Sequence, residues 1–210
     1  MHWAPTHLDD IVQALGEHLM LSALSVLIAL AIALPLGIAG ARRPRLHAFF
    51  LTVTGTIFVI PSLALFAALV PILGLGTAPA LVGLSSYCLL ILLRNIVAGL
   101  RGVAPEVLDA ADGMGFSQRR RLVQVELPLA LPLIVAGIRL AAVTVIGIAT
   151  IAAYINAGGL GTIIFAGIDQ RYPEKIIVGG GLTAALAITA DVLLGGAGGI
   201  ALAPRLSTPA

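Results

Sequence analysis

Residues 109–128 read DAADGMGFSQRRRLVQVELP, a long polar stretch in an otherwise apolar chain. Six of these twenty residues are charged, whereas the whole chain is 10% charged and 59% hydrophobic. Soluble domains carry roughly 25% charged residues and about 45–50% apolar ones. The chain therefore has the composition of an integral membrane protein, and its polar middle needs an explanation.

Apolar runs on either side of this stretch are long enough to cross a bilayer. Residues 48–93 contain no charged residue, and neither do residues 19–41. About 20 apolar residues span a hydrocarbon core of roughly 30 Å, so a soluble domain with an oversized core does not explain these runs. Lipid offers the backbone no hydrogen-bond partner, so each span must be helical. We expect an all-α, polytopic bundle of about five transmembrane helices, at residues 19–41, 48–70, 79–100, 129–153 and 176–202.

Basic residues are unevenly divided between the two sides that five spans create. One side has only Arg171 and Lys175. The other side has Arg42, Arg43, Arg45, Arg101, Arg119, Arg120, Arg121 and Arg205. By the positive-inside rule, the N-terminus lies outside and the C-terminus lies in the cytoplasm. We expect one transmembrane domain, residues 1–210, with a cytoplasmic loop at 101–128 and an outer loop at 154–175.

Two prolines and two charges fall inside the expected spans. Pro35 and Pro61 predict kinks, because proline removes a helical hydrogen bond. Arg139 and Asp191 lie at membrane depth, where charges are expensive and face the protein interior or a water-filled path. Snorkelling or a structural pair is the alternative for Arg139, and a structural polar contact is the alternative for Asp191. A direct pair between the two is a further hypothesis.

The sequence has few motifs that indicate catalysis or the binding of nucleotides, metals or nucleic acid. It has neither a GxxxxGK[ST] phosphate loop nor an HExxH zinc motif. The lone Cys88 excludes an intramolecular disulfide and a CxxC site. No basic stripe with interleaved aromatic residues is present, so nucleic acid is not an expected partner. We expect no catalytic residue, no metal site and no cofactor in this chain.

The polar stretch is punctuated like a folded loop rather than a solvated linker. Pro105 suits the first turn of a helix, and Gly113 and Gly115 are stop signals. Ser117 is a candidate N-cap for a second, basic helix, and Pro128 precedes the next span. We expect a short helix, a glycine bend and a basic helix. The three arginines of that second helix could contact anionic lipid head groups.

The same stretch resembles the coupling loop of ABC importer membrane subunits. That family's pattern is E-A-A, three residues, Gly, nine residues, then I-x-L-P. The spacing here matches throughout, with Asp in place of Glu and Val in place of Ile. The matching residues are Asp109, Ala110, Ala111, Gly115, Val125, Leu127 and Pro128. The resemblance implies that these residues receive force from an ATPase, across a low-relief surface of small side chains.

A second stretch, YINAGGLGTIIFAGIDQ at residues 154–170, narrows the resemblance. It is similar to permeases that import osmoprotectants, although methionine-type importers share the AGGLG core. Gly158, Gly159 and Gly161 permit irregular backbone near the membrane surface, which favours an outer gate or hinge. An ordinary loop with glycine turns is the alternative.

The resemblance implies a set of partners in a prokaryotic plasma (inner) membrane. They are a cytoplasmic ABC ATPase dimer that binds ATP and Mg²⁺, a second permease copy or paralogue, an external substrate-binding protein, and membrane lipid. The implied solute is glycine betaine, choline, carnitine or proline betaine. An amino acid or other small solute is the alternative, and a non-transport membrane bundle is the remote one. Aromatic residues make up only 5% of the chain, too few for a quaternary-ammonium cage, so we expect the binding protein to select the solute.

Overall fold

The computed structural model describes the backbone of residues 3–202 and the side chains of residues 3–196. All regular elements in that range are helical, as the composition predicts. In chain order they are η1 (Ala4–Thr6), α1 (Leu8–Arg42), α2 (Pro44–Val59), α3 (Ser62–Leu73), α4 (Thr77–Arg101), α5 (Pro105–Gly113), α6 (Gln118–Arg121), η2 (Leu122–Glu126), α7 (Leu127–Ala149), η3 (Ile151–Ile155), α8 (Leu160–Asp169) and α9 (Pro173–Leu202). Arg205 and the expected cytoplasmic C-terminus lie outside the described residues.

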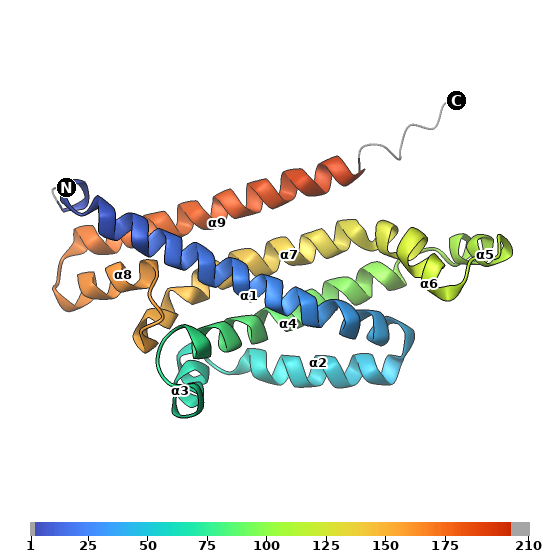
Figure 1. The fold of residues 1–210 in the computed structure, drawn as a ribbon, viewed down its shortest axis with the longest axis horizontal. Helices are drawn as coiled ribbons and strands as arrows, with labels where there is room; N and C mark the ends of the chain where they lie inside the picture. Colours follow the sequence, from blue (N-terminus) through green and yellow to red (C-terminus); the bar gives the residue numbers. More distant parts are fainter. Residues whose placement is uncertain (1–2, 203–210) are drawn as a thin grey trace.

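The long helices form an elongated bundle that the chain traverses repeatedly. Four stretches are long and apolar enough to cross a membrane, namely α1, α4, the continuous run from α6 to α7, and α9; the bent pair α2–α3 is a fifth. In Figure 1 these passes run along the long axis in alternating directions, with α5 at one end and α8 at the other. The five-span prediction agrees with this arrangement when α2 and α3 are counted as one span.

The expected span at 48–70 is wrong as a single helix. Its two halves, α2 and α3, meet at a bend of 98°, so Pro61 produces a break rather than a kink. Ile60, the residue before this proline, is extended, as proline imposes on its predecessor. The Ile60 carbonyl that the break releases accepts a hydrogen bond of 2.6 Å from the Tyr87 hydroxyl on α4. By contrast, α1 continues through Pro35 as one helix.

Helix α4 is the centre of the bundle and α9 is its edge. The most apolar stretch of α4 is 67% buried, compared with 11% for α9. Small residues let α4 approach its neighbours closely. A Cβ added to Gly99 would lie 3.1 Å from the Cβ of Ala130 on α7, and one added to Gly83 would meet the Phe66 ring on α3. Such contacts are typical of helix packing in lipid, where apolar surface alone does not drive association.

Candidate functional site

The polar loop folds as a helix, a tight glycine turn and a capped second helix. Two hydrogen bonds close helix α5: Gly115 N–H donates to the Asp112 carbonyl at 2.9 Å, and Phe116 N–H donates to the Ala111 carbonyl at 3.1 Å. This pair of bonds is the Schellman motif, and Gly115 occupies its left-handed position with φ +79°. Ser117 then caps α6 by accepting from Arg120 N–H. The structure therefore contains the short helix, glycine bend and N-cap that the sequence predicts.

The second helix does not end before the next span. It continues through the π-helical turn η2 into α7, as one stretch from 118 to 149. Leu127 N–H bonds to the Leu122 carbonyl, five residues back. Pro128 explains the wide turn, since proline has no N–H to donate and its ring clashes with the carbonyl four residues earlier. The prediction of a basic helix distinct from the next span is wrong in this respect, because the helical backbone continues from the loop into α7.

The residues that match the coupling pattern divide into a surface group and an anchoring group. Asp109, Ala110 and Gly115 are exposed. Ala111 is only 1% exposed, so it faces the loop's own interior and not the expected low-relief surface. The anchoring group, Val125, Leu127 and Pro128, is partly buried where η2 enters α7.

Apolar side chains accompany the exposed residues of this loop. Met114 is 68% exposed beside the glycine turn, and Val107 on α5 and Val123 on η2 are also exposed. The face combining these side chains with Asp109 and Ala110 is called here the loop face. Its exposed side chains are partly apolar and partly acidic.

Arg121 and Glu126 join the loop to the membrane bundle. Arg121 pairs with Asp112 on α5 through Nη1. Its Nε donates to Glu126 Oε1 at 3.1 Å, and the same oxygen lies 3.8 Å from Arg42 Nη2 at the end of α1. Glu126 is 8% exposed. The chain of charges therefore links α5, α6, η2 and α1.

These ion pairs bridge a hollow rather than a packed core. A cavity of about 410 Å³ separates α5 from the ends of α1 and α4. On its far side Arg101 donates to the Gly40 and Ala41 carbonyls at the α1 C-terminus, at 2.9 and 3.3 Å. The sequence analysis predicted no ion pair for Arg42, Asp112 or Glu126. The spacing gave no signal, because Arg121 and Glu126 are five residues apart and meet only across a π-helical turn.

At the opposite end, the glycines of the 154–175 segment receive two side chains from α1. Gly158 and Gly159 adopt φ of +83° and +82°. Gly159 N–H donates to Glu17 Oε2 at 2.9 Å, and Leu160 N–H donates to His18 Nδ1 at 3.3 Å. Glu17 and His18 thereby cap the start of α8. The sequence analysis missed both, and their separation of 142 residues from the glycines explains why.

His18 and Gly161 make this region compact. His18 is fully buried, and its Nε2 lies 3.0 Å from the Ile146 carbonyl on α7. Both contacts are satisfied by the neutral ring with its proton on Nε2. Gly161 lies against the Thr150 carbonyl, where a Cβ would clash. The three glycines therefore fit close contacts with α1 and with Thr150, the residue after α7. Their role as an outer gate or hinge stays a prediction.

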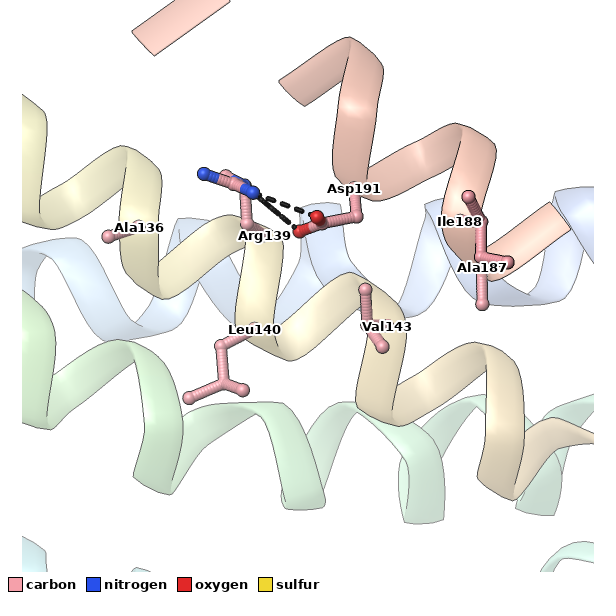
Figure 2. A pocket seen from close by; sticks show the side chains of 7 residues that line it. All are labelled: Ala136, Arg139, Leu140, Val143, Ala187, Ile188 and Asp191. Carbon is pink, nitrogen blue, oxygen red and sulfur yellow. Dashed lines mark hydrogen bonds and ion pairs between the residues drawn. The ribbon is translucent and has the colours of Figure 1, made fainter. Parts of the chain in front are cut away.

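Arg139 and Asp191 form the ion pair that the sequence suggested. Arg139 Nε donates to Asp191 Oδ1 at 3.0 Å, and Nη2 lies 2.8 Å from both carboxylate oxygens. Figure 2 shows the guanidinium reaching from α7 to the carboxylate on α9. The Arg139 side chain is thus held by a partner on the next helix instead of snorkelling to an interface.

One further intramembrane charge was missed. Arg94 lies on α4 and is exposed, and no acidic partner for it occurs among the described residues. It is seven residues from the end of α4, within the reach of a snorkelling side chain. In the part of the chain that the structure describes, no three His, Cys, Asp or Glu residues gather as a metal site would require.

A family model and several sequence relatives of this chain all describe membrane components of transport systems. Residues 33–207 match the family described as binding-protein-dependent transport system inner membrane component. The carnitine transport permease protein OpuCB of Listeria monocytogenes is 41% identical, over 85% of this chain and 82% of its own length. Two Bacillus subtilis proteins each match 92% of this chain. They are the glycine betaine/carnitine/choline permease OpuCB, 37% identical over 89% of its length, and the choline permease OpuBB, 39% identical over 87%.

A solved structure has the same architecture. A chain of the MetNI methionine ABC transporter, in an inward-facing conformation, superposes with a TM-score of 0.77. The alignment covers 93% of this chain and 95% of that chain, at 22% sequence identity. At this identity the likeness shows a shared fold.

Proposed function

Because this chain belongs to the family of binding-protein-dependent transport system inner membrane components, and is therefore a multi-pass transport subunit of the inner membrane, we propose that it imports an osmoprotectant. The solute class is glycine betaine, carnitine, choline or proline betaine. The observation that carries the proposal is the similarity to permeases with such solutes in their names, at 37–41% identity over more than four-fifths of both chains. Methionine is less well supported, since the methionine transporter shares 22% identity.

We further propose that the loop face receives a cytoplasmic ATPase. The loop is the part of the bundle that projects beyond the long helices (Figure 1). Asp109 and Met114 on this face supply a charge and an apolar anchor, and Arg121 connects the loop to the membrane helices. ATP and Mg²⁺ would be bound in that partner. Two ATPases would serve two permeases, the second being another copy or a paralogue, and an external binding protein would deliver the solute.

The proposed orientation places the α5 end in the cytoplasm and the α8 end outside. It is supported by the arginines near α5, including Arg42, Arg101 and Arg121. The α8 end then presents the 154–175 segment to the delivering protein, with Glu17 and His18 capping the start of α8.

Reconstitution tests the proposed function directly. The chain is placed in proteoliposomes with a candidate ABC ATPase and substrate-binding protein from the same genome. Uptake of radiolabelled glycine betaine, carnitine, choline and methionine is measured with and without ATP. We expect ATP-dependent uptake of at least one osmoprotectant and none of methionine. Uptake of methionine alone would favour the amino-acid alternative.

The ATPase contact is tested by Met114→Glu, with Arg119→Gln as an exposed control on the same loop. We expect the Met114→Glu chain to insert in the membrane but to lose co-purification of the ATPase, because a charge replaces the apolar anchor. Unchanged co-purification would remove the loop face as the docking surface.

A further inference from the structure

The Arg139–Asp191 pair occupies the membrane interior but is not closed off by this chain. Arg139 is ten residues from the end of α7, about 15 Å along the helix axis. The two side chains remain 37% and 44% exposed. Beside them lies a groove of about 410 Å³ between α7 and α9, lined otherwise by Ala136, Leu140, Val143, Ala187 and Ile188 (Figure 2). Charges at this depth face protein or water rather than acyl chains.

The pair has bonding capacity left on the groove side. Arg139 uses Nε and Nη2 to bind the carboxylate, and Nη1 has no partner in the described part of the chain. Asp191 Oδ2 accepts one bond where a carboxylate oxygen can accept two. Gly195 provides the space for the guanidinium, since a Cβ there would lie 2.9 Å from Arg139 Cζ. The cation and the anion are thus presented side by side, in small apolar surroundings.

Charge balance restricts which solutes can bind between Arg139 and Asp191. A solute that separates the pair must supply a carboxylate to Arg139 and a cationic group to Asp191. A zwitterion does both and leaves no charge unpaired. A simple cation satisfies Asp191 but leaves Arg139 without a counter-charge at membrane depth, which is unfavourable. Selection against the wrong solute then comes from the unpaired charge it creates.

We propose that Arg139 and Asp191 form a transient binding site for the two charges of a zwitterionic solute, and that they make the permease favour zwitterions over cations. This inference rests on the proposed function and narrows it. Within the osmoprotectant class it selects carboxylate-bearing betaines over choline. It adds a selective step within the membrane to the selection expected of the external binding protein.

The test measures the ratio of glycine betaine uptake to choline uptake in the reconstituted complex. Arg139→Gln leaves the Asp191 carboxylate alone, so we expect the ratio to fall about ten-fold or more. Asp191→Asn leaves the guanidinium alone, so we expect the ratio to rise above that of the unmodified chain. Thr189→Ala is the matched control, because this exposed side chain on α9 bonds only to its own helix and should leave the ratio unchanged.

A purely structural clamp between α7 and α9 gives a different result. Both variants then lose the two uptakes in parallel, the ratio stays constant, and the inference is overturned. If either single variant is absent from the membrane, the double variant with Arg139→Gln and Asp191→Asn replaces it, since it leaves no unpaired charge. Loss of the betaine preference in the double variant supports the site, and retention overturns it.

The ratio also separates this inference from the proposed function. An unmodified complex that imports neither solute contradicts the proposed function. An unmodified complex that imports both, with a ratio unaffected by Arg139→Gln, contradicts only the binding site.

Discussion

Two glycines, Gly113 and Gly115, differ only in backbone conformation and make a sharp test at the residue scale. Neither would meet an atom within 4 Å if it carried a Cβ. Gly113 is the last residue of α5, whereas Gly115 has φ +79°. Left-handed backbone costs a residue with a side chain about 1–2 kcal/mol. Of the two, only Gly115 is therefore conformationally required.

We predict that Gly115→Ala reduces ATP-dependent uptake while Gly113→Ala leaves it near that of the unmodified chain. The loss should come from distortion of the Schellman turn, which positions Met114 on the loop face. Uptake in proteoliposomes, normalised to inserted protein, measures the effect. Equal activity of the two variants would show that the turn does not matter for coupling.

A second prediction at this scale concerns Glu126, the acceptor shared by Arg121 and Arg42. Glu126→Gln keeps the shape of the side chain but removes its charge. Hydrogen bonds to charged groups contribute about 1.5–3 kcal/mol, so we expect a lower melting temperature in detergent. We also expect ATP hydrolysis to continue with less uptake per ATP, because the loop loses its link to α1.

The control for Glu126 is Arg119→Gln, which removes a charge from the same loop at an exposed position with no ion-pair partner among the described residues. An unchanged uptake-to-hydrolysis ratio in Glu126→Gln would mean that the ion pairs stabilise the loop without transmitting its movement.

At the scale of elements, a single side-chain hydroxyl, that of Tyr87, satisfies the carbonyl released by the break between α2 and α3. Tyr87→Phe leaves the Ile60 carbonyl without its partner while preserving the edge-on contact with Phe58. This bond is partly buried, and an acceptor left without a partner costs up to about 1–3 kcal/mol when it is shielded from water. We predict a lower melting temperature for Tyr87→Phe. Tyr154→Phe, which alters an exposed tyrosine, should leave it unchanged.

Elements were predictable where local chemistry determines them. Pro105, Gly115 and Ser117 each act within four residues, and α5, its turn and the start of α6 lie where these residues predict. Pro61 correctly marked a disruption, but the sequence did not predict the full 98° bend or the hydrogen bond from Tyr87 on another helix. Pro128 correctly marked the entry to the next span, but the π-helical turn before it, across which Arg121 pairs with Glu126, was not predicted.

Most contacts between segments distant in sequence could not be predicted from the sequence. Glu17 and His18 read as ordinary residues near the start of a span, and only the folded chain brings them to Gly159 and Leu160. Ala111 was assigned to the surface because its pattern was known but the rotation of its helix was not. Arg139 and Asp191 were the exception, since two opposite charges in apolar spans have few other partners.

At the scale of the whole molecule, the proposed orientation can be tested by cysteine labelling, because the sequence has a single native cysteine, Cys88. Cys88 is buried, so a membrane-impermeant maleimide should give little background in intact cells. We predict labelling of Tyr154→Cys, at the α8 end, and labelling of Met114→Cys only after the membrane is permeabilised. The reverse pattern would invert the topology and place the loop face outside.

The position of α9 at the edge of the bundle also has a consequence for biogenesis. Asp191 is synthesised 52 residues after Arg139, in the last long helix. Until α9 inserts, a nascent chain therefore holds an unneutralised guanidinium in the bilayer, a state that is expensive to maintain. A ribosome that stops before α9 leaves Arg139 without the carboxylate that neutralises it in the folded chain.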